Sequence, residues 1–231
     1  PDYLIFKIDT LVTGVNTFNL QLVLKDDVPA EALKPFYIRQ VSVDQHYTLQ
    51  SSSNDTTRYE RINYISNING KPIRPSVLKR TIFLNENELY TRQNQQLTLN
   101  RLMSMGSFRF VQVHFTETDS NRLDADIRLT PLPLNTLRAE MDLVTKSNNY
   151  TGPRMNVSLL NRNTFGGSEL LKLNLAGSFE AQLNRLSENL FSYTFNPQIE
   201  LTFPRLLVPF RVPSTNRLYT PQTRMALSYN F

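Results

Sequence analysis

Long segments in which polar and apolar residues alternate fill the second half of the chain, and they limit its fold more than any other feature. In Leu190–Phe203, every second residue from Phe191 to Phe203 is apolar, and the intervening residues are polar. A period of two is the pattern of a β-strand with one face against an apolar environment. Similar alternation, in places imperfect, occurs in Leu137–Lys146, Leu170–Gln182 and Gln222–Phe231, with a shorter case in Arg154–Leu160.

The length of these segments indicates what the apolar face meets. Strands in soluble proteins usually run about 5–6 residues, whereas a tilted strand needs about 9–11 residues to cross a bilayer. Several of the segments reach that length, which favours transmembrane strands. Alternation by itself leaves a soluble sandwich or a lipocalin-like barrel open.

The number of predicted strands limits the barrel that this chain can form. About five alternating segments are too few for a closed bacterial barrel, which has at least about 8 strands. An open sheet in lipid would leave backbone groups unpaired. If these strands cross a membrane, we therefore expect the native protein to continue beyond Phe231.

The first half of the chain has a different pattern, with helical signals confined to one region. Pro75–Ile82 begins with proline, which suits a first helical turn. Thr91 can cap a second helix, and Gly106 stands where that helix would end. From Phe36 the predicted order is strand, helix, helix, strand, strand. The predicted strands are Tyr3–Ile8, Phe18–Leu24, Phe36–Val43, Phe108–Phe115 and Leu123–Leu129, and Asp44–Arg58 reads as an exposed polar loop.

Composition argues against several classes of function. The net charge of +5 comes from scattered Lys and Arg residues, so we expect no nucleic-acid partner. The chain has no cysteine, and its two histidines, His46 and His114, are far apart, so we expect no metal site. Phosphate-binding, dinucleotide-binding and nucleophile-elbow motifs are all missing from the sequence. We therefore predict that the chain is not an enzyme and uses no cofactor.

Several short motifs follow one another in an order that resembles a known family. They are FYIRQVSV at Phe36–Val43, LYT at Leu89–Thr91, LNRL at Leu99–Leu102, GSF at Gly106–Phe108, LTP at Leu129–Pro131, NRNTFGGSE at Asn161–Glu169 and FEAQ at Phe179–Gln182. Their order and spacing cover more than half of the chain and resemble the BamA/TamA family of outer-membrane assembly proteins. Gly166–Gly167 would supply a tight turn between early barrel strands.

The resemblance implies a fold class and a domain division. It predicts an α+β POTRA module of order β-α-α-β-β, followed by antiparallel strands that form part of a transmembrane β-barrel. Residues 1–34 would be the end of a preceding POTRA domain with its linker, 35–133 a POTRA domain, and 134–231 the first barrel strands. The chain would lie in the outer membrane of a Gram-negative bacterium, with its POTRA region in the periplasm.

Two groups of site residues follow from this prediction. The first would bind partners: an exposed POTRA strand could accept a client strand by β-augmentation, with the side near Phe36 as second choice, and the first barrel strand would border a seam that templates an incoming strand. These residues are Phe108, Phe110, Gln112, His114, Leu137, Ala139, Met141 and Leu143. The second group would face lipid: Leu171, Leu173, Leu175, Phe179, Phe191, Tyr193, Phe195, Ile199, Leu201 and Phe203.

The predicted function is assembly and insertion of outer-membrane proteins, with unfolded clients and the lipid bilayer as partners. Accessory lipoproteins or periplasmic scaffold proteins would be further partners. Two alternatives remain open at this point. One is a secretion pore that passes a single exported protein, and the other is a soluble β-rich protein that binds a hydrophobic ligand.

Overall fold

The computed structural model divides the chain into two compact units, Pro1–Phe36 and Tyr37–Phe231. It describes residues 3–9, 19–26, 28–29, 33–48, 55–66, 71–119, 121–147, 149–182, 190–208 and 221–231. The described structure consists mostly of antiparallel β-strands with two helices. Each unit is taken by itself below.

The first unit holds one antiparallel hairpin, formed by β1 (Leu4–Asp9) and β2 (Asn19–Leu24). Its register places six large apolar side chains on one face, and all six are exposed. They are Leu4, Phe6, Ile8, Leu20, Leu22 and Leu24. A two-stranded hairpin is marginally stable in water, so this face needs a further layer.

The second unit begins with an α/β module, Tyr37–Pro131, built on a five-stranded sheet of order β4-β5-β3-β7-β6. The central strand β3 (Tyr37–Asp44) runs parallel to both β5 (Ile62–Ser66) and β7 (Arg122–Pro131). The outer strands β4 (Asp55–Tyr59) and β6 (Phe108–Asp119) are antiparallel to their neighbours.

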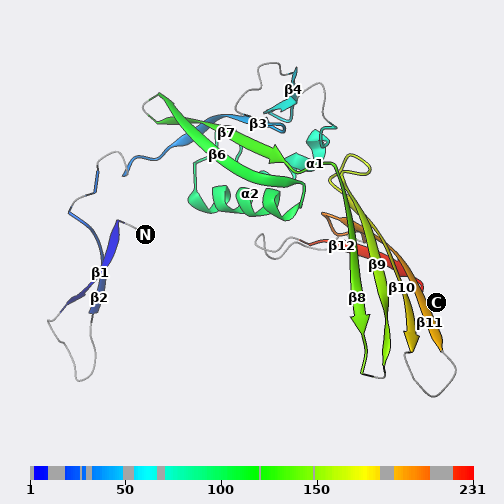
Figure 1. The fold of residues 1–231 in the computed structure, drawn as a ribbon. Helices are drawn as coiled ribbons and strands as arrows, with labels where there is room; N and C mark the ends of the chain where they lie inside the picture. Colours follow the sequence, from blue (N-terminus) through cyan, green and yellow to red (C-terminus); the bar gives the residue numbers. More distant parts are fainter. Residues whose placement is uncertain are drawn as a thin grey trace. The chain divides into compact units, whose positions relative to one another are not determined.

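Two helices cover this sheet, α1 (Pro75–Lys79) and α2 (Arg92–Ser104), and Figure 1 shows α2 lying along β6 and β7. The Thr91 side chain accepts a hydrogen bond from the backbone N–H of Asn94 at 3.2 Å, which confirms the predicted cap. Gly106 follows the helix with φ of +69°, a left-handed conformation that favours glycine. Helix α1 ends earlier than the predicted Ile82.

The core of the module fills the space between the sheet and the helices. Its buried residues come from β3, β5, β6, β7, both helices and the segments beside and between the helices. They are Ile38, Val41, Val43, Ile62, Tyr64, Ile73, Leu78, Ile82, Leu84, Leu102, Met105, Phe108, Ala125, Ile127 and Leu129. Burial raises the pKa of the Tyr64 hydroxyl, because the charged phenolate is disfavoured there.

Strand β4 corrects the sequence analysis, which read Asp44–Arg58 as a loop, and its partner β5 was not predicted. Residues 49–54 lie outside the described residues, but Asp55–Tyr59 pairs with Ile62–Ser66 in a regular antiparallel register. The turn between them places Glu60 and Arg61 at φ of 45° and 64°. This is the conformation of a tight hairpin turn that usually uses Asn or Gly.

The C-terminal sheet, Asn135–Ser228, is a separate five-stranded antiparallel sheet of order β12-β11-β10-β9-β8. Its strands follow one another in sequence and stand side by side in Figure 1. They are β8 (Asn135–Thr145), β9 (Tyr150–Arg162), β10 (Leu170–Gln182), β11 (Phe191–Phe203) and β12 (Thr223–Ser228). Strand β9 is considerably longer than the predicted Arg154–Leu160.

Candidate functional site

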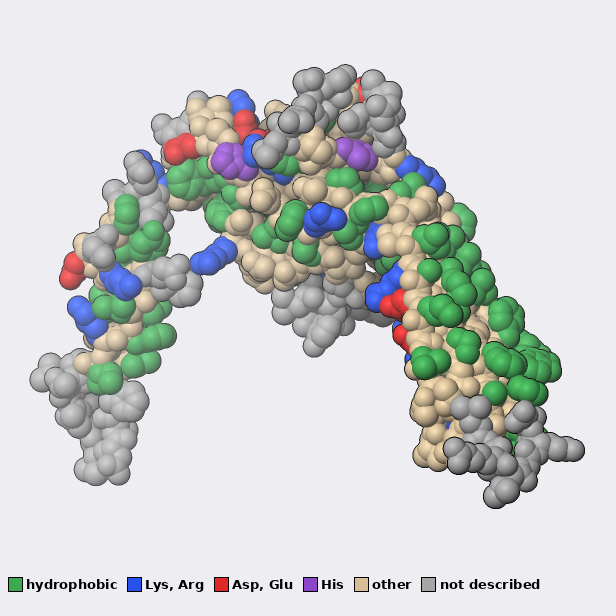
Figure 2. Space-filling view, in the orientation of Figure 1, with side chains coloured by type: hydrophobic (Ala, Val, Ile, Leu, Met, Phe, Trp, Pro, Cys, Tyr) green, Lys and Arg blue, Asp and Glu red, His purple; other side chains and the backbone are tan. Residues whose placement is uncertain are grey.

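The register of the C-terminal sheet aligns apolar residues in rows that cross all five strands. One row consists of Leu137, Leu159, Leu173, Ile199 and Leu227. Another consists of Met141, Met155, Gly177 and Phe195 on β8 to β11, and Phe231, three residues beyond β12, continues it. Figure 2 shows hydrophobic side chains gathered along these strands. We call this surface the apolar face.

The apolar face is strongly exposed, with Leu137 at 70%, Met141 at 76% and Leu227 at 73% of full exposure. Monomeric soluble proteins rarely expose a contiguous apolar surface that crosses a whole sheet. Such a surface indicates contact with lipid or with another apolar layer.

The opposite face of the same sheet is polar, and its groups pair across strands. Arg154 donates to Asp142 at 3.2 Å, and Asn156 donates to Glu140 at 3.4 Å. The hydroxyls of Ser178 and Thr194 lie 2.7 Å apart. This face suits water, so the two faces of the sheet suit different solvents.

All ten residues predicted to face lipid lie on the apolar face. Leu175, Phe179, Phe191, Tyr193, Phe195 and Ile199 are exposed, and Leu171, Leu173, Leu201 and Phe203 are half-buried. Aromatic rings stack between neighbouring strands, as in Phe179 with Phe191, whose ring centroids are 5.7 Å apart. The structure brings these residues together, while their contact with lipid stays a prediction.

Strand β8 forms one edge of this sheet, and β12 forms the other. Within the described residues, neither strand pairs with another strand along its outer side. Leu137, Ala139, Met141 and Leu143 all lie on β8 and are exposed. The predicted seam residues therefore border a row of backbone N–H and C=O groups that a further strand could pair with.

Strand β6 is an edge of the α/β module, as the sequence analysis predicted, whereas β3, which follows Phe36, is central. Phe110, Gln112 and His114 are exposed on one face of β6. Phe108 differs from them and is a correction: it is 5% exposed and belongs to the core. A register shift between Phe108 and Phe110 turns the two side chains to opposite faces.

A second feature of the unit is the turn between β9 and β10, Asn163–Glu169, which we call the docking loop. Asn163, Gly166 and Ser168 adopt φ of 140°, 83° and 63°. The Ser168 backbone N–H donates to the Asn163 side chain at 3.0 Å. Glu169 accepts hydrogen bonds from the backbone N–H of Gly167 at 2.9 Å and of Phe165 at 3.2 Å. These bonds hold a strained backbone in one conformation.

The docking loop contacts the α/β module through polar groups. The Asn163 amide donates to the carbonyl of Lys71 at 3.1 Å, and the Arg74 backbone N–H donates to the carbonyl of Gly166 at 2.9 Å. The hydroxyls of Ser107 and Ser168 lie 2.5 Å apart and are buried. The loop therefore ties the C-terminal sheet to the segments that precede α1 and β6.

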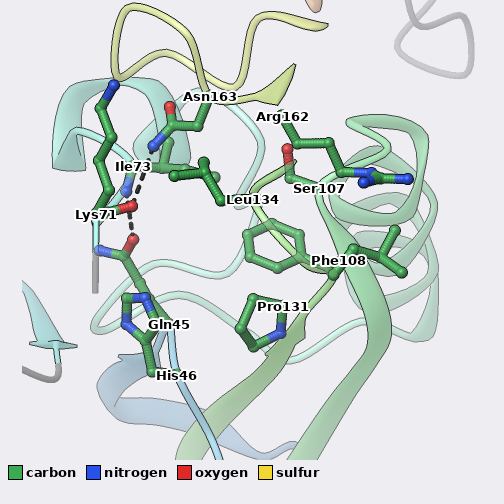
Figure 3. Close-up of a pocket in the computed structure, with 11 residues that line it drawn as sticks. Gln45, His46, Lys71, Ile73, Ser107, Phe108, Pro131, Leu134, Arg162 and Asn163 are labelled. Atoms are coloured by element: carbon green, nitrogen blue, oxygen red, sulfur yellow. Dashed lines mark hydrogen bonds between the residues drawn. The ribbon is translucent and has the colours of Figure 1, made fainter. Parts of the chain in front are cut away.

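A cavity of about 260 Å³ lies beside this contact, and Figure 3 shows the residues that line it. The Gln45 side chain accepts a hydrogen bond from the Ile73 backbone N–H at 2.8 Å. His46 lines the same cavity, and burial lowers the pKa of its imidazole, although Asp44 acts in the opposite direction. The cavity thus favours a neutral histidine.

Sequence analysis missed three residues that shape the C-terminal sheet and the docking loop: Gly152, Arg74 and Glu169. A Cβ atom at Gly152 would lie 1.8 Å from the carbonyl oxygen of Phe179 on the neighbouring strand. A glycine inside a strand is the signal that could have shown this close approach. For Glu169 the signal was an acid directly after a Gly-Gly-Ser turn.

No helix in the described part of the chain is long and apolar enough to cross a membrane. Over the same residues, no group of three or more His, Asp or Glu side chains could hold a metal ion.

Comparison with known proteins gives likeness in structure only, since neither a protein-family model nor a curated protein matches the chain. One similar solved structure is BamA from Haemophilus ducreyi lacking POTRA domains 1–3, with 12% identity and a TM-score of 0.35 over 98% of this chain and 40% of that one. Another is CdiB from Acinetobacter baumannii, with 10% identity and a TM-score of 0.37 over 86% of this chain and 55% of that one. The chain thus spans about half the length of these proteins or less. Its function has to be inferred from its own residues.

Proposed function

We propose that this chain is part of an outer-membrane protein assembly factor, in which the α/β module is a periplasmic POTRA domain and the C-terminal sheet is the start of a transmembrane barrel. The observation that carries the proposal is the apolar face. It spans five strands, and three of these have 13 residues each, long enough for a tilted crossing. A polar, cross-paired face on the other side suits a water-filled lumen.

The order of elements in the α/β module supports the POTRA assignment. After β3 come α1, α2, β6 and β7, with the β4–β5 hairpin inserted before the helices. Its edge strand β6 exposes Phe110, Gln112 and His114. A client strand could pair with this edge and gain main-chain hydrogen bonds.

The proposal assigns β8 to the lateral seam of the barrel. A strand in lipid cannot leave its backbone groups unpaired. The outer edge of β8 would therefore pair with a late strand of the same protein, and exchange of that pairing would admit a client strand. Leu137, Met141 and Leu143 would meet lipid or the client.

The soluble alternative requires the apolar side of β11 to be covered inside the protein. Phe191, Tyr193 and Phe195 are instead exposed. A decisive test uses the fact that the chain contains no tryptophan. The variant Phe195→Trp, in mixed micelles of detergent and lipid, should be quenched by lipids brominated in the acyl chains.

The matched control is Thr194→Trp, one residue along β11 on the polar face. It should resist the same quencher. Equal quenching of both variants, or stronger quenching at position 194, would contradict the membrane assignment.

A second experiment addresses the activity. A photo-crosslinking residue at Met141 of the full-length native protein, tested in growing cells, should give adducts with several newly made outer-membrane proteins. Adducts with one exported protein would instead favour a dedicated secretion pore. Adducts with lipid alone would contradict the seam mechanism.

A further inference from the structure

A second cavity, of about 350 Å³, lies where α1, the end of α2 and the docking loop meet the segment after β11. Four arginines line it, Arg74, Arg80, Arg101 and Arg205, and Glu169 supplies a carboxylate. The volume lies at the lower end of the range for ligand sites and suits a small group. The cavity is therefore concave, small and rich in guanidinium groups.

The Glu169 carboxylate offsets only one of the four guanidinium charges. It is 4% exposed, and its oxygens accept from the backbone N–H groups of Phe165 and Gly167 and lie 3.8 Å from the Arg74 guanidinium. Glu169 is thus engaged inside the docking loop. The remaining arginines leave the cavity with a positive charge.

Two of the arginines are available to a ligand. Arg80 and Arg205 are exposed, and within the described residues neither forms an ion pair. Arg101 is more enclosed: its guanidinium lies 6.0 Å from the centre of the Phe83 ring, and burial lowers its pKa. A bound anion offsets such a desolvation cost.

The ligand chemistry follows from these donors. A guanidinium presents a planar fork of N–H groups that matches the oxygens of a phosphate. Ser76 adds a hydroxyl to the lining, and the volume of about 350 Å³ suits one small anion rather than an extended polyanion.

The place of the cavity in the fold suggests the source of the phosphate. Arg205 lies two residues beyond the end of β11, and the next residues, Leu206, Leu207 and Val208, are exposed and apolar. A cation beside an apolar segment at a strand end is the arrangement found at the boundary between lipid and water. A phospholipid headgroup would reach the arginines from that boundary.

We propose that the cavity lined by Arg74, Arg80, Arg101 and Arg205 is a binding site for a phosphate group, which a phospholipid headgroup presents. The inference that a phosphate binds here depends only on the residues that line the cavity. Only the lipid source rests on the proposed membrane function.

The test uses the full chain in an uncharged maltoside detergent, with calorimetric titration of two probes. The probes are inorganic phosphate and dihexanoyl-phosphatidylglycerol. The variant is Arg80→Gln/Arg205→Gln, which removes the two exposed guanidiniums that form no ion pair within the described residues. The matched control is Arg109→Gln/Arg122→Gln, which removes the same charge from exposed positions that do not line the cavity.

We expect the wild-type chain and the control to bind the lipid, and the variant to bind it at least tenfold more weakly. Binding of inorganic phosphate alone, with the same loss in the variant, would support the phosphate site and assign a free anion as its source. That result would leave the quenching of Phe195→Trp, and hence the membrane function, unaffected. Binding of neither probe, or equal weakening in variant and control, would overturn the proposal.

Discussion

The docking loop makes a quantitative prediction through Glu169, whose carboxylate holds two backbone N–H groups. Replacement by alanine leaves the buried N–H of Gly167, 2.9 Å from the carboxylate, without its acceptor. The N–H of Phe165, at 3.2 Å, loses the same acceptor but belongs to an exposed residue that water can reach. An unsatisfied buried donor costs about 1–3 kcal/mol. The exposed N–H of Phe165 adds a smaller cost to that of Gly167, so Glu169→Ala should destabilise the loop by about 2–4 kcal/mol.

Glu169→Gln separates the hydrogen bonds from the charge. Its amide oxygen can accept from the same two N–H groups, and only the 3.8 Å approach to Arg74 is lost. The Arg74 side chain is 60% exposed, so this ion pair contributes less than about 1 kcal/mol. The glutamine variant should therefore be far milder than the alanine variant.

Hydrogen exchange of the full chain in detergent, followed at the amides of 165–168, measures this difference. A cost of about 2–4 kcal/mol corresponds to exchange roughly 30- to 1,000-fold faster in Glu169→Ala, since each factor of ten is about 1.4 kcal/mol. Glu169→Gln should stay within about tenfold of wild type. Glu117→Ala, at an exposed position of β6, is the control and should leave these amides unchanged. Equal effects of alanine and glutamine would refute the argument, because charge and not hydrogen bonding would then hold the loop.

Three further predictions concern the sheet, a helix cap and pH. Gly152→Ala should disrupt the pairing of β9 with β10, because its Cβ would meet a backbone oxygen at 1.8 Å, and the amides of both strands should exchange faster in detergent; Gly177→Ala, with its nearest atom at 3.5 Å, should leave that exchange unchanged. Thr91→Ala should destabilise the first turn of α2 by about 1 kcal/mol, seen as faster amide exchange in that turn alone. The lowered pKa of His46 means that folding favours its neutral form, so stability is fully present above the ordinary value of 6.5 and falls as pH drops below it. Thermal unfolding of His46→Gln between pH 7 and pH 5 should show a flatter dependence than wild type, and an unchanged slope would count against this role.

Local patterns were enough to predict most elements of this chain. The alternation in Leu170–Gln182 and Leu190–Phe203 predicted β10 and β11 almost to the residue, because side chains on a strand alternate between faces whatever lies beyond them. The cap at Thr91 and the left-handed Gly106 were readable for the same local reason.

Strands β4 and β5 and the start of β9 escaped sequence analysis. For β4 and β9, the local sequence signals argue against a strand. Strand β4 is exposed at every residue, so it has no apolar face to produce an alternation. Its turn places Glu60 and Arg61 at positive φ, where the sequence offers no glycine or asparagine as a marker. The start of β9 was hidden by Gly152 and Pro153, which normally argue against a strand interior.

Tertiary structure alone decided which side chains meet and which are hidden. Phe108 and Phe110 are two residues apart, so a regular strand would place both side chains on the same face. A bulge instead buries Phe108 and exposes Phe110. The four arginines of the second cavity lie in three separate segments of the chain, and only the folded chain brings Arg205, which follows β11, to the three arginines of the α/β module. The periodicity of a strand depends on neighbouring residues, and the sequence determined it. A charge cluster depends on which distant segments pack, and only the folded chain determines that.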